Sequence, residues 1–244
     1  RVTRADLDRV SATRPVGVLH ASGHILNVNS KGLELAGLLK TGNNHPGIPL
    51  ASDGLPTGEL KGPEITMPAG KHVGMDRAFL SADAQGLRNF GRLCVRAGVT
   101  TSSDLGQQLT DELVDLFLDV TGDPSYPACL VAFRINFGMS PAELVDYTAS
   151  LRPRSTERLD LGRIKVIADG SIQGFSARLR WPGYYNGSEN GLWYIAPDQL
   201  AQIYELALQK GVQVHTHTNG DEATQLSIET LEAALRKAPD FDHR

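Results

Sequence analysis

The stretch that decides the fold is RIKVIADGSIQGFSARL, residues 163–179. A lysine, Lys165, lies inside an otherwise apolar run, and Asp169 follows where this run breaks into a loop at Gly170 and Ser171. A charged amine in a buried strand is costly unless it is paired, neutralised or chemically modified. The stretch therefore predicts a buried strand that carries one chemically unusual position.

A second strand-like run, VQVHTHTNGD, occupies residues 212–221, at a spacing that suits the next βα unit of an α/β barrel. Side chains alternate between the two faces of a strand, so Lys165 shares a face with Asp169, and His215 shares one with His217. If these faces line a barrel, all four side chains point into its lumen. Asp169 and His217 then lie nearest the carboxyl ends of the strands, where barrels keep their active sites.

Strands and helices alternate from residue 81 to residue 237, which predicts parallel βαβ units. Helix starts are marked by Thr110, by the capping box Ser140-Pro141-Ala142-Glu143, and by Asp221 as a predicted N-cap. A closed barrel of eight units needs about 200 residues or more after its first strand. The predicted fold is therefore α/β, a partial (β/α) TIM barrel over residues 81–244 that we expect to continue beyond this chain.

Residues 1–80 are predicted to form an irregular, insert-like segment rich in glycine and proline. Within it, Asn29 or Ser30 is expected to cap a short helix. Residues 40–75 have little helix signal, and Asp53-Gly54 predicts a turn suited to a hairpin. A long segment of this kind in a compact domain is often functional.

The composition is that of an ordinary globular protein, with 41% hydrophobic residues and a net charge of −4. This charge leaves no basic surface for nucleic acid. No apolar run approaches the roughly 20 residues that span a bilayer, and the first residues do not resemble a signal peptide. We therefore expect no nucleic-acid or membrane partner and a cytoplasmic location. Cys94 and Cys129 are expected to be reduced core residues.

Two mechanisms use a lysine in a barrel lumen. A lysine whose pKa falls on burial can form a Schiff base with a carbonyl substrate, as a lyase would. Alternatively, the neutral amine can take up carbon dioxide, and the resulting carbamate is an oxygen ligand that bridges two metal ions. Histidine nitrogen suits zinc, so His217 on the neighbouring strand favours a metal site that activates water and polarises a carbonyl.

Structural interpretations account for the same residues. Lys165 can extend to solvent or form an ion pair with Asp169, and either histidine can be a hydrogen-bonded core residue. Asp221 has a sufficient structural function as an N-cap, and a lone loop histidine such as His24 is usually solvated. A non-catalytic binding or structural domain therefore stays open beside the two enzymatic hypotheses.

Five ordered motifs resemble the YtcJ-like branch of the amidohydrolase superfamily, which includes N-substituted formamide deformylase. In chain order they are PVGVLHASGHILNVNSKGLELAGL, DGLPTGEL, AGVTTSSDLG, IKVIADGSIQGFSARL and GVQVHTHTNGDEA. The resemblance runs over nearly the whole chain and implies a distorted TIM barrel of the amidohydrolase type. It also implies hydrolysis of amide-type C–N bonds, other than peptide bonds, in small-molecule substrates. The implied cofactor is one or two divalent metal ions, usually zinc.

Within this resemblance, Lys165 corresponds to the strand lysine that is carbamylated or faces the metal. His217 corresponds to the histidine of a His-x-x-Gly-Asp pattern. These two residues are thereby implied as catalytic residues and metal ligands. His24 and Asn29, in a Gly-His…Asn-Ser motif, and Asp169, in an Asp-Gly-Ser motif, are implied to bind substrate.

The resemblance places the remaining metal-site residues outside this sequence. The first-strand His-x-His pair would precede residue 1, and a further metal histidine and the last-strand aspartate, the usual general base, would follow residue 244. We therefore expect residues 1–244 to be the central part of an enzyme and, by themselves, to bind metal poorly and lack activity. An open barrel exposes strand edges and apolar groups, so we also expect homo-oligomers.

Overall fold

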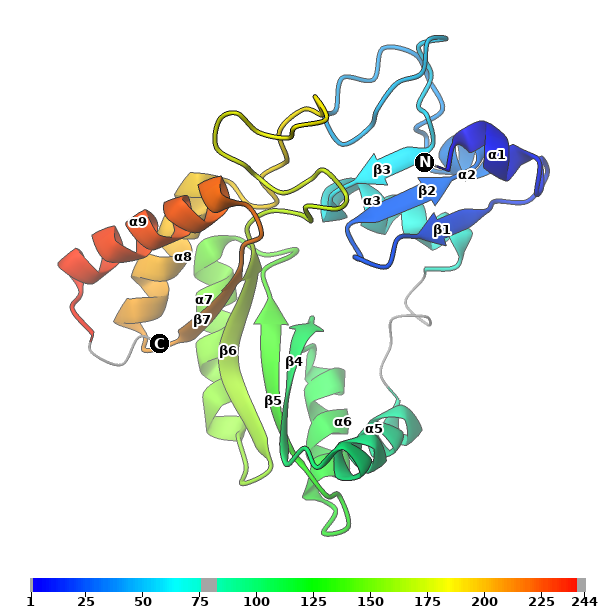
Figure 1. The fold of residues 1–244 in the computed structure, drawn as a ribbon. Helices are drawn as coiled ribbons and strands as arrows, with labels where there is room; N and C mark the ends of the chain where they lie inside the picture. The colour runs from blue at the N-terminus through cyan, green and yellow to red at the C-terminus, as the bar shows by residue number, and fades with distance from the viewer. Residues whose placement is uncertain (1, 76–82, 241–244) are drawn as a thin grey trace. The chain divides into compact units, whose positions relative to one another are not determined.

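The computed structural model describes residues 2–75 and 83–240, and Figure 1 shows their elements. The chain divides into two compact units, each assembled from segments that are distant in sequence. We call the first the loop unit; it comprises residues 1–81, 169–194 and 218–224. We call the second the sheet unit; it comprises residues 82–168, 195–217 and 225–244. The predicted boundary between residues 80 and 81 lies outside the described residues.

The sheet unit contains a parallel sheet of four strands in the order β4-β5-β6-β7 (Figure 1). The strands are β4 (Thr101–Gln107), β5 (Cys129–Ile135), β6 (Leu159–Ile167) and β7 (Gln213–His217). The helices are α5 (Ala84–Ala97), α6 (Asp111–Gly122), α7 (Pro141–Leu151), η2 (Arg152–Arg154), α8 (Pro197–Gln209) and most of α9 (Asp221–Lys237). Because spatial order follows chain order and a helix separates successive strands, the predicted α/β class with parallel strands is confirmed.

Helix starts in the sheet unit mostly follow the predicted capping signals. The Thr110 side chain caps α6, and Ser140 and Glu143 form a reciprocal capping box before α7. Asp221 is different, because it is the first residue of α9 rather than the residue before it. The N-cap prediction for Asp221 is therefore wrong. Its carboxylate instead accepts hydrogen bonds from the backbone and side chain of Arg180, at 3.0 and 3.1 Å.

The helices pack against one face of the sheet. On β6, Leu159 and Leu161 join a core formed with α5 and α6. Further along the same strand, Ile164 and Val166 join a second core formed with α7 and α8. The helix-facing positions of β6 thus change from odd to even residue numbers within one strand, which strict alternation does not allow.

A β-bulge in β6 causes this change. Between neighbouring register pairs, β5 advances two residues, from Val131 to Phe133, while β6 advances three, from Asp160 to Arg163. The additional residue is accommodated at Gly162, whose φ of +92° is unfavourable for residues with a side chain. A methyl group there would also lie 2.9 Å from the Arg152 Cβ. Glycine is therefore required for the bulge.

The bulge determines which way Lys165 points. Continued alternation from Leu161 would turn Lys165 toward the helices. After the bulge, Ile164 and Val166 face the helices instead, and Lys165 and Ile167 lie on the opposite face of the sheet. Strand parity thus places Lys165 with Ile167, whereas Asp169 lies beyond the end of β6, so its predicted sharing of a face with Lys165 stays a prediction.

The loop unit contains a three-stranded antiparallel sheet in the order β1-β2-β3. Its strands are β1 (Gly17–Leu19), β2 (Ile25–Val28) and β3 (Glu59–Lys61), and its helices include α1 (Arg4–Asp8), α2 (Ser30–Leu35), α3 (Pro63–Gly70) and η1 (Lys71–Val73). Leu26, Val28, Leu33 and Leu60 form its buried core. The predicted Asp53-Gly54 turn is confirmed, since it lies within an antiparallel bridge between Leu50 and Pro56.

Helix α3 contradicts the prediction that residues 40–75 contain little helix. The sequence signal is weak because Pro68 lies inside the helix. The helix nevertheless begins with Pro63 at a position where proline is compatible with helical geometry, and it buries Thr66 and Ala69. Tertiary burial outweighs the weak local propensity here. The N-terminal segment is consequently more regular than the glycine and proline content predicts.

The composition also led to predictions about the two cysteines and about membrane-spanning segments. Both cysteines are free; Cys94 lies in the core, whereas Cys129 is only half-buried. Within the described residues, no helix is long and apolar enough to cross a membrane.

The bulge is testable with Gly162→Ala. We expect this change to lower the free energy of unfolding by about 1–3 kcal/mol, because it forces a side chain into a positive-φ conformation against Arg152. Chemical denaturation measures the loss. Gly106→Ala in β4 is the matched control, because a methyl group there meets nothing within 4 Å and φ is not positive. Equal stability of the two variants would contradict the assignment of Gly162 to a required bulge.

Candidate metal centre

Lys165 lies at the middle of the sheet face opposite the helices. Strand register sets it between Ile135 of β5 and His215 of β7. Only 7% of the residue is exposed, so the interpretation of Lys165 as a side chain that extends to solvent is wrong. Burial lowers the pKa of the Lys165 ammonium. The sheet unit therefore contains a buried amine whose uncharged form is favoured.

Two histidines lie on the same face of the neighbouring strand. His215 pairs in register with Lys165, and His217 pairs with Ile167, two residues closer to the carboxyl end. This offset is about 6.6 Å along the strand, which the flexible lysine stem can span. The predicted sharing of one sheet face by Lys165, His215 and His217 is thus borne out by the register.

His215 is exposed, but its ring contacts a neighbouring aromatic side chain. Its ring packs edge-on against Phe133, with ring centroids 5.8 Å apart. Burial lowers the pKa of His215, and the neighbouring Lys165 and His217 lower it further. His215 is therefore held toward its neutral form beside the lysine.

These residues are of types that can contribute to a metal-binding donor set. Neutral imidazole is a good zinc ligand, whereas a lysine amine becomes an oxygen ligand only after carbamylation. Among the described residues, no cluster of three or more His, Cys, Asp or Glu side chains has the arrangement that holds a metal ion. Lys165 and His217 therefore fit a metal centre only as two of its ligands.

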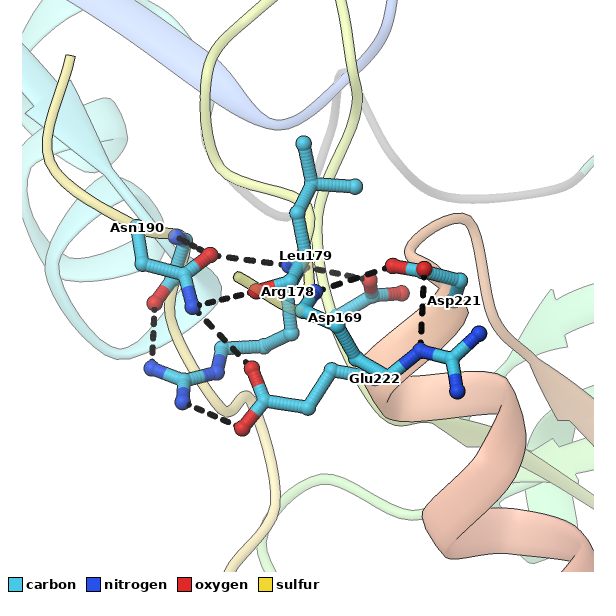
Figure 2. A network of polar contacts seen from close by, with 8 residues as sticks. Asp169, Arg178, Leu179, Asn190, Asp221 and Glu222 are labelled. Carbon is cyan, nitrogen blue, oxygen red and sulfur yellow. Dashed lines mark hydrogen bonds and ion pairs between the residues drawn. The ribbon is translucent and has the colours of Figure 1, made fainter. Parts of the chain in front are cut away.

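Asp169, predicted to bind substrate, belongs to a network of polar contacts in the loop unit, part of which Figure 2 shows. One carboxylate oxygen accepts from the backbone N–H of Asn219 at 2.8 Å. The other accepts from the backbone N–H groups of Gly220 and Arg178, at 2.8 and 2.9 Å. The residue is fully buried, and its carboxylate joins the segment after β6 to the segment after β7. These contacts favour a structural function, while substrate binding by Asp169 stays a prediction.

A second layer of polar contacts surrounds Asp169 (Figure 2). The Arg178 guanidinium pairs with Glu222 at 2.7 Å, and Asn190 donates to the same carboxylate at 3.0 Å. Arg180 pairs with Asp221, and the backbone hydrogen bond from Arg180 is the main cause that lowers the pKa of Asp221. The sequence analysis missed Arg178, Asn190 and Glu222, because partners as far apart as 44 residues leave no local pattern.

Asn29 and His24, also predicted to bind substrate, lie in the loop unit. All hydrogen-bonding groups of the Asn29 side chain are used: its oxygen accepts from Val16 and Gly32, and its nitrogen donates to Ser11 and Arg14. Asn29 is fully buried and caps α2. These contacts favour a structural function here too.

His24 is less buried than Asn29. It is half-buried, and its ring lies 5.5 Å from that of Tyr194, tilted by 43°. Burial raises the pKa of the Tyr194 hydroxyl. Substrate binding by His24 therefore stays a prediction that the geometry permits.

The sheet unit is a parallel α/β sheet that carries a buried lysine and a histidine on its helix-free face. The amidohydrolase family matches residues 1–244, so the chain belongs to that family.

Two curated relatives are similar to the chain over almost its whole length. Protein LONG AFTER FAR-RED 3 of Arabidopsis thaliana and the putative amidohydrolase YtcJ of Bacillus subtilis (strain 168) are each 28% identical to the chain over 98% of its length. The chain spans 42% and 44% of these two proteins, less than half their length.

Two solved structures share the fold at 19% identity over 95% of the chain. They are uncharacterized metal-dependent hydrolases from Pyrococcus horikoshii OT3 and Pyrococcus furiosus, with TM-scores of 0.56 and 0.55. The chain covers 44% and 46% of their lengths.

The burial of Lys165 is testable with Lys165→Met in metal-free protein and carbon-dioxide-free buffer. We expect a higher melting temperature at pH 7, because the change removes a buried ammonium. The folded-state pKa of Lys165 lies below its ordinary value of 10.5, so the wild type regains stability as pH rises from that pKa toward 10.5. The gain should therefore shrink at pH 10. Lys237→Met, at an exposed site, is the control; a gain independent of pH would contradict the burial argument.

The structural function of Asn29 is testable with Asn29→Ala. We expect a loss of about 2–4 kcal/mol in the free energy of unfolding, because the change removes a helix cap and leaves buried backbone groups unpaired. Asn27→Ala is the matched control, since the Asn27 side chain makes one hydrogen bond, to Val2. If Asn29→Ala is as stable as this control and changes only KM, Asn29 contacts substrate instead.

Proposed function

We propose that the full-length protein is a metal-dependent hydrolase of amide-type C–N bonds in small molecules, other than peptide bonds. Membership of the amidohydrolase family supports hydrolysis. The observation that carries the proposal is the burial of Lys165, with its lowered pKa, on the helix-free sheet face that it shares with His217. The substrate class rests on the sequence resemblance.

Lys165 and His217 would hold the metal, which we propose to be zinc. When bound, a divalent metal supplies Lewis-acid activation of water and of the scissile carbonyl. Lys165 would contribute an anionic oxygen donor once its neutral amine attacks carbon dioxide: an N–C bond forms, one C=O π bond opens to give the carboxylate oxygen, and an N–H proton passes to solvent. His217 contributes an imidazole nitrogen from the carboxyl end of β7.

The chain's own residues favour carbamylation of Lys165. Carbon dioxide reacts with the uncharged amine, and burial raises the uncharged fraction at a given pH. His215, beside Lys165 and held toward its neutral form, adds little positive charge to the same face. A carbamate at Lys165 would also replace a buried ammonium by a group that pairs with a cation.

We also propose that β4 to β7 are consecutive strands of a (β/α) TIM barrel. Parallel strands in chain order, with helices covering one face, are the arrangement of that fold. The face that carries Lys165 would then line the lumen, with His217 at the carboxyl end of its strand.

The metal site is testable in the full-length protein with Lys165→Ala and His217→Ala. We expect each change to lower bound zinc and to lower kcat/KM on amide substrates by more than about 100-fold, beyond the effect of residues that only support ligands. Inductively coupled plasma mass spectrometry measures the metal, and a panel of small amides measures turnover. Lys237→Ala and His72→Ala, at exposed positions, are the matched controls.

Two further measurements separate the alternatives. A short-chain carboxylate should partly restore zinc to Lys165→Ala, because it supplies the missing oxygen donor. Borohydride trapping of a substrate carbonyl on Lys165 would instead support the Schiff-base lyase. Unchanged zinc and unchanged turnover in both variants would leave a non-catalytic role for this sheet face.

A further inference from the structure

Asp169 connects the two strands that carry the candidate ligands. The chain leaves β6 after Ile167 and leaves β7 after His217, and hydrogen bonds continue between the two segments beyond both strand ends. The Ala168 N–H donates to the His217 carbonyl at 3.0 Å. Two residues later, the Asn219 N–H donates to Asp169 at 2.8 Å. His217 is therefore held by hydrogen bonds at its own carbonyl and at the residue two positions on.

The segment that follows His217 has little freedom to take another conformation. Gly220 also donates to Asp169, and a methyl group at Gly220 would lie 1.7 Å from the Arg178 carbonyl oxygen. The Asn219 side chain donates to the Gly170 carbonyl at 2.7 Å. The backbone of residues 219 and 220 is thus fixed against the segment that begins at Asp169.

We propose that Asp169 is a positioning residue, which sets the orientation of the His217 ring by fixing the backbone immediately after it. The inference rests on the proposed function of His217 as a metal ligand. Asp169 would act through main-chain N–H groups and would touch neither metal nor substrate, because the residue is fully buried and its carboxylate oxygens accept three backbone hydrogen bonds. Charged acceptors make such bonds short and directional.

The chemistry of the carboxylate explains why an aspartate is needed. Three N–H donors converge on two oxygens, and a carboxylate offers acceptors at both positions, whereas a carboxamide offers them at one. In Asp169→Asn, one oxygen becomes an NH₂ group that faces a backbone donor. The segment from Asn219 to Gly220 must then shift, and His217 shifts with it.

The test uses Asp169→Asn in the full-length protein. We expect the zinc dissociation constant, measured by competition with a chelator, to rise about 10- to 100-fold, as when a group that orients a ligand is removed. We also expect the visible absorption bands of the Co²⁺-substituted protein to change, because they report ligand geometry. A purely structural function of Asp169 would lower the melting temperature and leave zinc affinity and the Co²⁺ spectrum of the folded protein unchanged.

Two control variants calibrate these readouts. Glu222→Gln removes the ion pair with Arg178 but leaves the three hydrogen bonds to Asp169, so zinc affinity should stay that of the wild type. Ser140→Ala removes the cap of α7 and gives a destabilised protein with the ligand strands intact. Wild-type zinc affinity and Co²⁺ spectrum in Asp169→Asn would overturn the proposal.

Zinc binding by His217→Ala and by Asp169→Asn tests the ligand function of His217 separately from the positioning function of Asp169. If His217→Ala loses zinc while Asp169→Asn binds it normally, His217 is a ligand and Asp169 does not position it. If His217→Ala itself retains zinc, the ligand assignment fails first, and positioning of a metal ligand by Asp169 fails with it.

Discussion

The β-bulge at Gly162 is the constraint on which the candidate site depends. Before it, the odd-numbered residues of β6 pack against α5 and α6; after it, the even-numbered residues pack against α7 and α8. Both halves of the strand bury apolar side chains, so the bulge costs little core area. Its consequence is chemical, because the change of parity sends Lys165 to the face without helices. A strand without the bulge would bury the ammonium among apolar helix residues, which is far more costly.

The candidate ligands belong to the sheet unit, and the carboxylate that we propose to position His217 belongs to the loop unit. Lys165 and His217 are strand residues of the sheet unit, whose positions follow from register and parity. Asp169, Arg178 and Gly220 belong to the loop unit, where backbone and carboxylate hydrogen bonds replace strand pairing. The chain passes from one to the other directly after each of these strands, so strand geometry sets the location of the two candidate ligands, and in our proposal the loop hydrogen bonds orient His217.

Local patterns predicted much of the fold. Two helix caps could be predicted from the sequence, the capping box at Ser140 and Glu143 and the cap at Thr110, because their partners lie within one turn of helix. Helix α3 could not be predicted in this way, because Pro68 weakens its helix propensity and the helix is stabilised by burial of its side chains. Asp221 was misassigned for a related reason: its carboxylate bonds to Arg180, a residue 41 positions away, which no helix-start pattern can reveal.

The sequence by itself determined the strand containing Lys165, the histidines at the end of the next strand, and the family to which both belong. Alternation and spacing carry that information, since they express period-2 geometry and the length of a βα unit. Only the tertiary structure decided that the amine is buried and that the side chains of Asp169 and Asn29 form hydrogen bonds with the backbone. Burial and long-range hydrogen bonds depend on which distant segments meet, and that depends on the packing of the whole chain.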